Sequence, residues 1–191
     1  METGEAAAIE RARAGDRDAF RVLVEQHSRT VFRVAYRMTG NEQDAEDIVQ
    51  ETFLKAYRQM HNFDGRAKFV TWITRIAANC SLDLLRARQR RGEAVEADEG
   101  RLSSPHVSPE QEAASREVRV RLQAALARLS PAERAAFVMR HYEGAGVDEI
   151  ARVLAKPAGA TRHCIFRAVT KLREALEPFV SAAQACGGTE A

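Results

Sequence analysis

The chain has 191 residues, enough for one medium domain or two small ones, and its formal net charge of +2 indicates no particular class of partner. Its three cysteines, Cys80, Cys164 and Cys186, are an odd number without CxxC spacing, which is typical of reduced thiols and argues against a disulfide framework. The sequence shows neither a signal peptide nor an apolar stretch approaching about 18 residues, so we expect a cytoplasmic protein without membrane insertion.

The first predicted elements are helices that form a block from about residue 5 to residue 91. Gly15 and Asp16 break the first helix. Gly40 suits the position after a helix and Asn41 suits an N-cap, so a further helix should begin at residue 42 and be followed by a loop over 61–68. Between these breaks, apolar residues recur at steps of three and four, as on an amphipathic helix: Phe20, Leu23, Val24, His27, Val31, Val34, Ala35 and Met38.

The helix after Asn41 carries five acidic residues and no basic one in its first half. Acidic side chains near a helix N-terminus interact favourably with the helix dipole, which accounts for part of this cluster. However, Asp44, Asp47 and Glu51 also share one side of the helix, with Gln50 beside them. Because such a stripe repels DNA and attracts a basic surface, we predict that it docks a protein partner.

The next helix, predicted over 69–91, has an apolar stripe and a separate polar side. An asparagine flanked by arginines can bond base edges while the arginines hold phosphates, and the preceding loop suits unstacked bases. We therefore predict a surface for an opened DNA strand; the alternative is a solvated arginine cap over a core tryptophan, Trp72. The polar side comprises Arg75, Asn79, Asp83, Arg86 and Arg90, and the loop contributes Phe63, Asp64, Arg66 and Lys68.

Residues 92–108 are predicted to form a flexible acidic linker, because they combine acids, Gly, Ser and Pro with few large apolar side chains. Helices should resume where Ser108 can cap and Pro109 can take the first helical position, and "SPAE" at 130–133 repeats this device. The expected fold is thus all-α, with two small helical domains over 1–91 and 109–179 and a disordered tail over 180–191.

The second domain contains a predicted helix-turn-helix. A short helix over 147–154 is followed by the joint "AKPAG" and by a second helix. That second helix carries a basic face, in a segment, 158–173, with four basic residues and no acid. It is predicted to enter a DNA major groove, and the alternative is an ordinary helical hairpin with a solvated basic face. The outward residues of this helix are Arg162, His163, Arg167 and Lys171.

Together these residues resemble the extracytoplasmic-function sigma factors, the minimal two-domain initiation subunits of bacterial RNA polymerase. "DAEDIVQETFLKAYR" is similar to the polymerase-docking helix of their region 2, and "FVTWITRIAANCSLDLLRARQR" has the family's Trp, then "RIA-x-N", then Asp and Arg. "LSPAERAAFVMRHYEG" before the helix-turn-helix resembles region 4. The matches cover roughly residues 10 to 177, in the family's order.

The resemblance implies a role for each surface. The acidic stripe would bind the clamp helices of the largest polymerase subunit, and the polar side of 69–91 with its loop would capture the non-template strand of the −10 element, flipping a base. The linker would pass near the polymerase active-site channel, and an anti-sigma factor is a further expected partner. The residues implied at the −35 element are Arg162, His163, Phe166, Arg167 and Lys171.

The sequence departs from the family pattern at the start of the recognition helix, "AKPAGATRHC". Thr161 replaces an apolar residue, and Cys164 replaces a common basic one. We find no catalytic, metal-binding or cofactor-binding constellation, and we expect no enzyme activity. The rival hypotheses are a dimeric helix-turn-helix repressor or activator, which leaves the acidic stripe unexplained, and a helical adaptor that binds only proteins, which leaves both basic faces unexplained.

Overall fold

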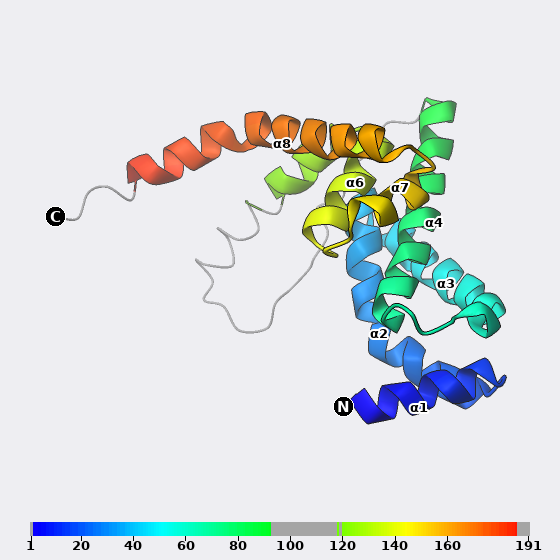
Figure 1. The fold of residues 1–191 in the computed structure, drawn as a ribbon. Helices are drawn as coiled ribbons and strands as arrows, with labels where there is room; N and C mark the ends of the chain where they lie inside the picture. The colour runs from blue at the N-terminus through cyan, green and yellow to red at the C-terminus, as the bar shows by residue number, and fades with distance from the viewer. Residues whose placement is uncertain (1, 93–117, 119, 187–191) are drawn as a thin grey trace. The chain divides into compact units, whose positions relative to one another are not determined.

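We obtained a computed structural model of the chain that describes residues 2–92, 118 and 120–186 (Figure 1). The chain divides into two compact units, Met1–Ala94 and Val95–Ala191, which we name the N-terminal unit and the C-terminal unit. Every regular element in the described ranges is a helix, which confirms the predicted all-α class. Within these ranges, none of the helices combines the length and the apolar character that a bilayer crossing requires.

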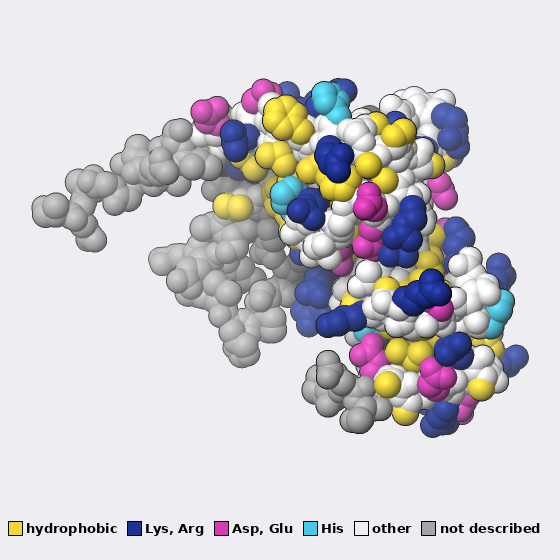
Figure 2. All heavy atoms as spheres, viewed as in Figure 1, with side chains coloured by type: hydrophobic (Ala, Val, Ile, Leu, Met, Phe, Trp, Pro, Cys, Tyr) yellow, Lys and Arg dark blue, Asp and Glu magenta, His cyan; other side chains and the backbone are white. Residues whose placement is uncertain are grey.

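The N-terminal unit is a bundle built around its second helix. α2 packs against α1, α3 and α4, and α3 also packs against α4. Figure 2 shows charged side chains over much of its visible surface, with hydrophobic side chains exposed between them. The helices are α1 (Glu2–Arg13), α2 (Arg17–Thr39), α3 (Glu42–Gln59), the 3-10 helix η1 (Met60–Asn62) and α4 (Phe69–Arg91).

Local sequence signals set the ends of these helices, and Gly40 and Asn41 act as predicted. The Asp16 carboxylate caps α2 by accepting from the Ala19 N–H at 3.0 Å. Gly40 ends α2 in the left-handed conformation with φ of 75°, which a residue without Cβ adopts at little cost. Asn41 Oδ1 then accepts from the Asp44 N–H at 2.9 Å and starts α3. The predicted face of α2 is inward, and Leu23, Val31, Val34, Ala35 and Met38 are fully buried.

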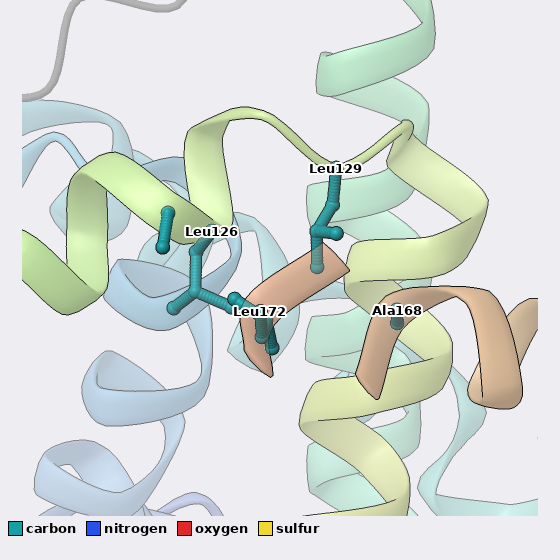
Figure 3. Close-up of a cluster of buried hydrophobic side chains, with 5 residues drawn as sticks. Leu126, Leu129, Ala168 and Leu172 are labelled. Atoms are coloured by element: carbon teal, nitrogen blue, oxygen red, sulfur yellow. The ribbon is translucent and has the colours of Figure 1, made fainter. Parts of the chain in front are cut away.

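The C-terminal unit contains a helical segment over 120–127 and three further helices. α6 packs against α7 and α8, and α7 packs against α8. Leu126 and Leu129 meet Ala168 and Leu172 of α8 in a buried apolar cluster (Figure 3). The helices are α6 (Pro131–His141), α7 (Val147–Leu154) and α8 (Ala158–Cys186).

Two features of this unit test the predicted starts and ends of helices. Ser130 and Glu133 form the predicted capping box, with the Glu133 carboxylate accepting from the Ser130 N–H at 3.0 Å. By contrast, α8 extends to Cys186, so the prediction of a disordered tail from 180 was wrong for 180–186. Helix propensity favours this continuation, because three alanines occur in "SAAQAC" and the next glycine is Gly187, while Pro178 lies within α8 and does not end it. Residues 187–191 and, apart from Gly92, the predicted linker and the start at Ser108 and Pro109 lie outside the described residues.

The joint between α7 and α8 has an unusual backbone. α7 ends at Leu154, and its C-cap residue, Ala155, adopts the left-handed conformation with φ of 52°. It is the one non-glycine residue with positive φ in the described ranges. A Cβ in this conformation contacts the backbone and costs about 1–2 kcal/mol, so the alanine of "AKPAG" is strained where glycine would not be.

Candidate functional site

The acidic side of α3 is only partly free to meet a partner. Asp47, Gln50 and Glu51 are exposed, as predicted for a docking surface. Leu54, one turn further along, leaves 58% of its surface exposed, which adds an apolar contact to this side. Glu51 pairs with Lys55 at 2.8 Å, an exposed contact of the kind that contributes little to stability. We call Asp47, Gln50, Glu51 and Leu54 the α3 face.

Asp44, which the sequence grouped with this stripe, points into the unit. Only 13% of its side chain is exposed, and both carboxylate oxygens bond the guanidinium of Arg88. The contact between Arg88 Nη2 and Asp44 Oδ1 is 2.7 Å. This charge-assisted, two-point bond joins the first turn of α3 to the last turns of α4. Asp44 therefore holds the two helices together, and its carboxylate is engaged before any partner arrives.

Lys55 makes a second polar contact between α3 and α4. Its Nζ donates to Cys80 Sγ at 3.4 Å. Burial raises the pKa of the Cys80 thiol, despite the nearby Lys55 ammonium, so the thiol is protonated at neutral pH. A buried, protonated thiol is a poor nucleophile, and Cys80 acts as a packing residue.

The polar side of α4 lies where the sequence predicted it. Asn79, Asp83 and Arg90 are exposed, while Arg75 and Arg86 are half-buried. The flanking Ala78 and Cys80 are both buried, so the helix is tightly packed on one side and open at Asn79. An exposed amide at this position can donate to and accept from a base edge.

The loop before α4 contains both exposed and buried members of the predicted set. Asp64, Arg66 and Lys68 are exposed, and Asp64 Oδ1 accepts from the Arg66 N–H at 3.0 Å. Phe63, by contrast, is only 4% exposed. The centroid of its ring lies 5.1 Å from the ring centroid of Trp72 and 5.7 Å from that of Phe69. In this structure the Phe63 ring anchors the loop to α4 and is not open to a base.

The exposed side of α8 carries the predicted recognition residues. Arg162, His163, Phe166 and Arg167 are exposed, and Phe166 leaves 68% of its surface open. On the face of the C-terminal unit shown in Figure 2, basic, histidine and hydrophobic side chains lie next to one another. Thr161 is fully buried, and its hydroxyl donates to the Pro157 carbonyl at 3.1 Å. The unusual threonine thus packs inward with its polar group satisfied.

Sequence reasoning missed the partner of two of these cations. Glu133 of α6 is buried, and its carboxylate lies 2.9 Å from Arg167 Nε and 2.7 Å from Lys171 Nζ. Burial acts to raise the pKa of Glu133, but the hydrogen bonds from Lys171 and Ser130 outweigh it and hold the pKa below its usual value. The carboxylate is therefore charged at neutral pH. "SPAE" indicated a cap, but no local signal indicates a partner 38 residues away.

The described residues contain no group of three or more side chains suited to a metal ion. The candidate site is instead a set of surfaces: the α3 face, the polar side of α4 with its loop, and the exposed side of α8. The first is acidic and the other two are rich in basic side chains. Such surfaces bind macromolecules of opposite charge.

Comparison with known proteins finds the same two units. A family model described as Sigma-70 region 2 matches residues 23–91, and one described as Sigma-70, region 4 matches residues 119–172. The ECF RNA polymerase sigma factor SigE of Mycolicibacterium smegmatis is 40% identical over 155 residues, which are 81% of this chain and 60% of that protein. The ECF RNA polymerase sigma factor SigW of Bacillus subtilis is 31% identical over 88% of this chain and 94% of its own length.

A solved structure supports the same relationship. CnrH, in complex with the cytosolic domain of CnrY, matches with a TM-score of 0.63 and 26% identity. The match covers 92% of this chain and 98% of CnrH. The similarity therefore extends over both units and over nearly the whole of a relative.

Proposed function

The chain belongs to the extracytoplasmic-function sigma factors, and we propose that it directs core RNA polymerase to specific promoters as an alternative sigma factor. It is a non-enzymatic initiation factor: polymerase carries out the chemistry. The N-terminal unit docks the polymerase and captures the single-stranded −10 element, while the C-terminal unit reads the duplex −35 element. We propose that the protein acts in the bacterial cytoplasm.

The observation that carries this proposal is the division of charge between helices. One exposed side of α3 is acidic, whereas the exposed sides of α4 and α8 carry arginines with Asn79 or His163 among them. A DNA-binding protein that acts without polymerase would leave the acidic side of α3 unexplained. An adaptor that binds only proteins would leave the basic sides of α4 and α8 unexplained. Co-purification with core polymerase, followed by run-off transcription, distinguishes the three possibilities.

The α3 face is proposed to meet the clamp helices of the largest polymerase subunit, with Leu54 adding apolar contact to the charges. Charge reversal there should weaken association strongly. We expect Asp47→Lys with Glu51→Lys to bind core polymerase at least about tenfold more weakly, since close charge pairs across interfaces are worth more than about 1.4 kcal/mol. Reversal of the exposed Glu10 and Glu25, on α1 and α2, is the matched control. Equal binding by the two double variants would contradict the docking assignment.

The polar side of α4 is proposed to act after base pairs open. Asn79 is exposed and can bond a base edge only when the base is unpaired. Asn79→Ala should therefore slow promoter opening more than it weakens the closed complex. A pre-melted template should restore opening and leave base selectivity reduced. Normal opening of duplex promoters by Asn79→Ala would remove this role.

The exposed side of α8 is proposed to read the −35 element from the major groove. Arg162 lies in the first turns of the helix, where recognition helices contact base edges, so we assign it to a base. Arg162→Ala should cost about 1–3 kcal/mol of discrimination if it bonds guanine with two nitrogens. Selection from a randomised duplex pool measures this loss. If the selected sequence and the salt dependence both stay unchanged, α8 does not read DNA in this way.

An anti-sigma factor is the last proposed partner. CnrH, which resembles this chain over both units, was solved with the cytosolic domain of another protein. By analogy, a cytosolic domain that covers the α3 face or the basic sides would keep this chain from polymerase and promoter. Addition of such a domain should block run-off transcription, and it should fail to do so if added after a stable open complex has formed.

A further inference from the structure

The carboxylate of Glu133 has more partners than its place in the helix requires. In a capping box, the third residue of the helix needs to accept only from the backbone N–H of the N-cap residue. Glu133 Oε2 makes that bond with Ser130 at 3.0 Å. The same carboxylate also pairs with Arg167 Nε at 2.9 Å and with Lys171 Nζ at 2.7 Å, both from α8. One side chain thus links the start of α6 to the recognition helix.

The exposure of the three side chains shows which of them is fixed. Only 3% of the Glu133 side chain is exposed, whereas 55% of Arg167 and 38% of Lys171 are exposed. The cap and the surrounding packing fix the buried Glu133 carboxylate, and the Arg167 and Lys171 side chains extend to it from the surface. An ion pair between mobile surface side chains has little effect on their positions, but a buried anchor restricts the rotamers of its partners.

The nitrogen through which Arg167 pairs with Glu133 determines which of its nitrogens can still contact DNA. The Glu133 carboxylate forms its ion pair at the Nε edge, 2.9 Å away, and within the described residues no hydrogen bond is found for any nitrogen of this guanidinium, so the two terminal nitrogens stay available. Those two nitrogens form the fork that contacts guanine O6 and N7, or phosphate, in a bidentate manner. Lys171 lies one turn further along the helix and uses its single ammonium group on Glu133. The two terminal nitrogens of Arg167 therefore remain available to DNA, whereas the Lys171 ammonium is engaged by Glu133.

We propose that Glu133 is a positioning residue for DNA reading: it fixes the Arg167 guanidinium for bidentate contact with one base and holds Lys171 back from the phosphates. This inference rests on the proposed −35 reading by α8. It assigns Glu133 a part in sequence discrimination although the residue does not itself contact DNA. A cap that served only the fold would not need cations from α8.

The test is selection of duplexes from a randomised pool by the full chain, with discrimination measured at each base pair. Glu133→Gln keeps an acceptor for the cap but lacks the charge and the second oxygen that hold both cations. Glu133→Ala removes both oxygens. Ser130→Ala is the matched control, because it weakens the same cap and leaves the ion pairs intact. Circular dichroism melting of each variant verifies that the compared proteins are folded.

We expect Glu133→Gln and Glu133→Ala to lower discrimination by at least about fivefold at one base pair, the lower end of the contribution of a bidentate contact. Ser130→Ala should leave discrimination unchanged. In an Arg167→Ala background, the Glu133 substitutions should have no further effect at that base pair, because the residue acts through Arg167.

Two results would overturn the proposal while leaving the proposed function intact. In the first, wild type selects a sequence and both Glu133 variants select it with equal discrimination. In the second, the loss in the Glu133 variants persists undiminished in the Arg167→Ala background. If wild type selects no duplex sequence at all, the −35 role of α8 fails, and the role of Glu133 falls with it.

Discussion

Replacement of Phe63 by alanine should destabilise the N-terminal unit rather than act on DNA directly. The sequence grouped this residue with the strand-capturing loop, yet it is only 4% exposed and packs against both Trp72 and Phe69. Removal of a buried phenylalanine ring costs about 3–5 kcal/mol, through lost burial and the cavity that remains. Because Trp72 is itself only half-buried, the site can partly collapse, and we expect a value near about 3 kcal/mol.

The consequence for the whole unit is large. Domains of this size are stable by about 5–15 kcal/mol, and each 1 kcal/mol moves the melting temperature of a 60–100-residue domain by about 4–8 °C. Phe63→Ala should therefore lower the melting temperature of the N-terminal unit by about 12 °C or more. The chain has a single tryptophan, Trp72, which contacts Phe63, so its fluorescence during urea unfolding reports on this unit alone.

Two variants give this prediction its controls. His61→Ala changes an exposed residue of the adjacent turn and should stay within about 0.5 kcal/mol of wild type. Phe63→Leu keeps much of the buried volume and should fall between the two. If Phe63→Ala unfolds at the same urea concentration as His61→Ala while promoter opening is lost, the ring acts on bases and the packing argument is wrong.

Three further predictions concern single contacts. Asp44→Asn should destabilise the N-terminal unit by about 1.5–3 kcal/mol in urea unfolding, because it weakens the charge-assisted bonds to Arg88, whereas Asp47→Asn should change little. Ala155→Gly should stabilise the C-terminal unit by about 1 kcal/mol in circular dichroism melting, because it relieves the left-handed strain; no gain would mean that the joint is not strained. Folding lowers the pKa of Glu133, so the ionised carboxylate contributes stability above its ordinary pKa of 4.5, and this contribution is lost as the pH falls through the folded pKa. Glu133→Gln should not show this acid-induced loss of stability. If wild type and Glu133→Gln lose stability in parallel on acidification, the Glu133 contribution is contradicted.

The sequence by itself predicted the parts of this protein that depend on short-range interactions. α4 and α7 occupy the predicted ranges, and α2 ends at the predicted glycine. Apolar periodicity and capping chemistry act within about one or two helical turns, so they can be read from neighbouring letters. The quoted motifs also implied the family that the comparisons found. The end of α8 was misplaced because helix propensity near a chain end is only a weak signal.

The tertiary structure alone decided which polar residues are free. Asp44 and Asp47 lie on the same side of α3 by spacing, yet one is bonded to Arg88 and the other is exposed. Phe63 reads as a loop aromatic, but helix packing places its ring on Trp72. Glu133 reads as a cap, and only the packing of α6 against α8 brings two cations to its carboxylate. These contacts join residues 9 to 44 positions apart, and periodicity along one helix carries no information on which face of another helix will meet it.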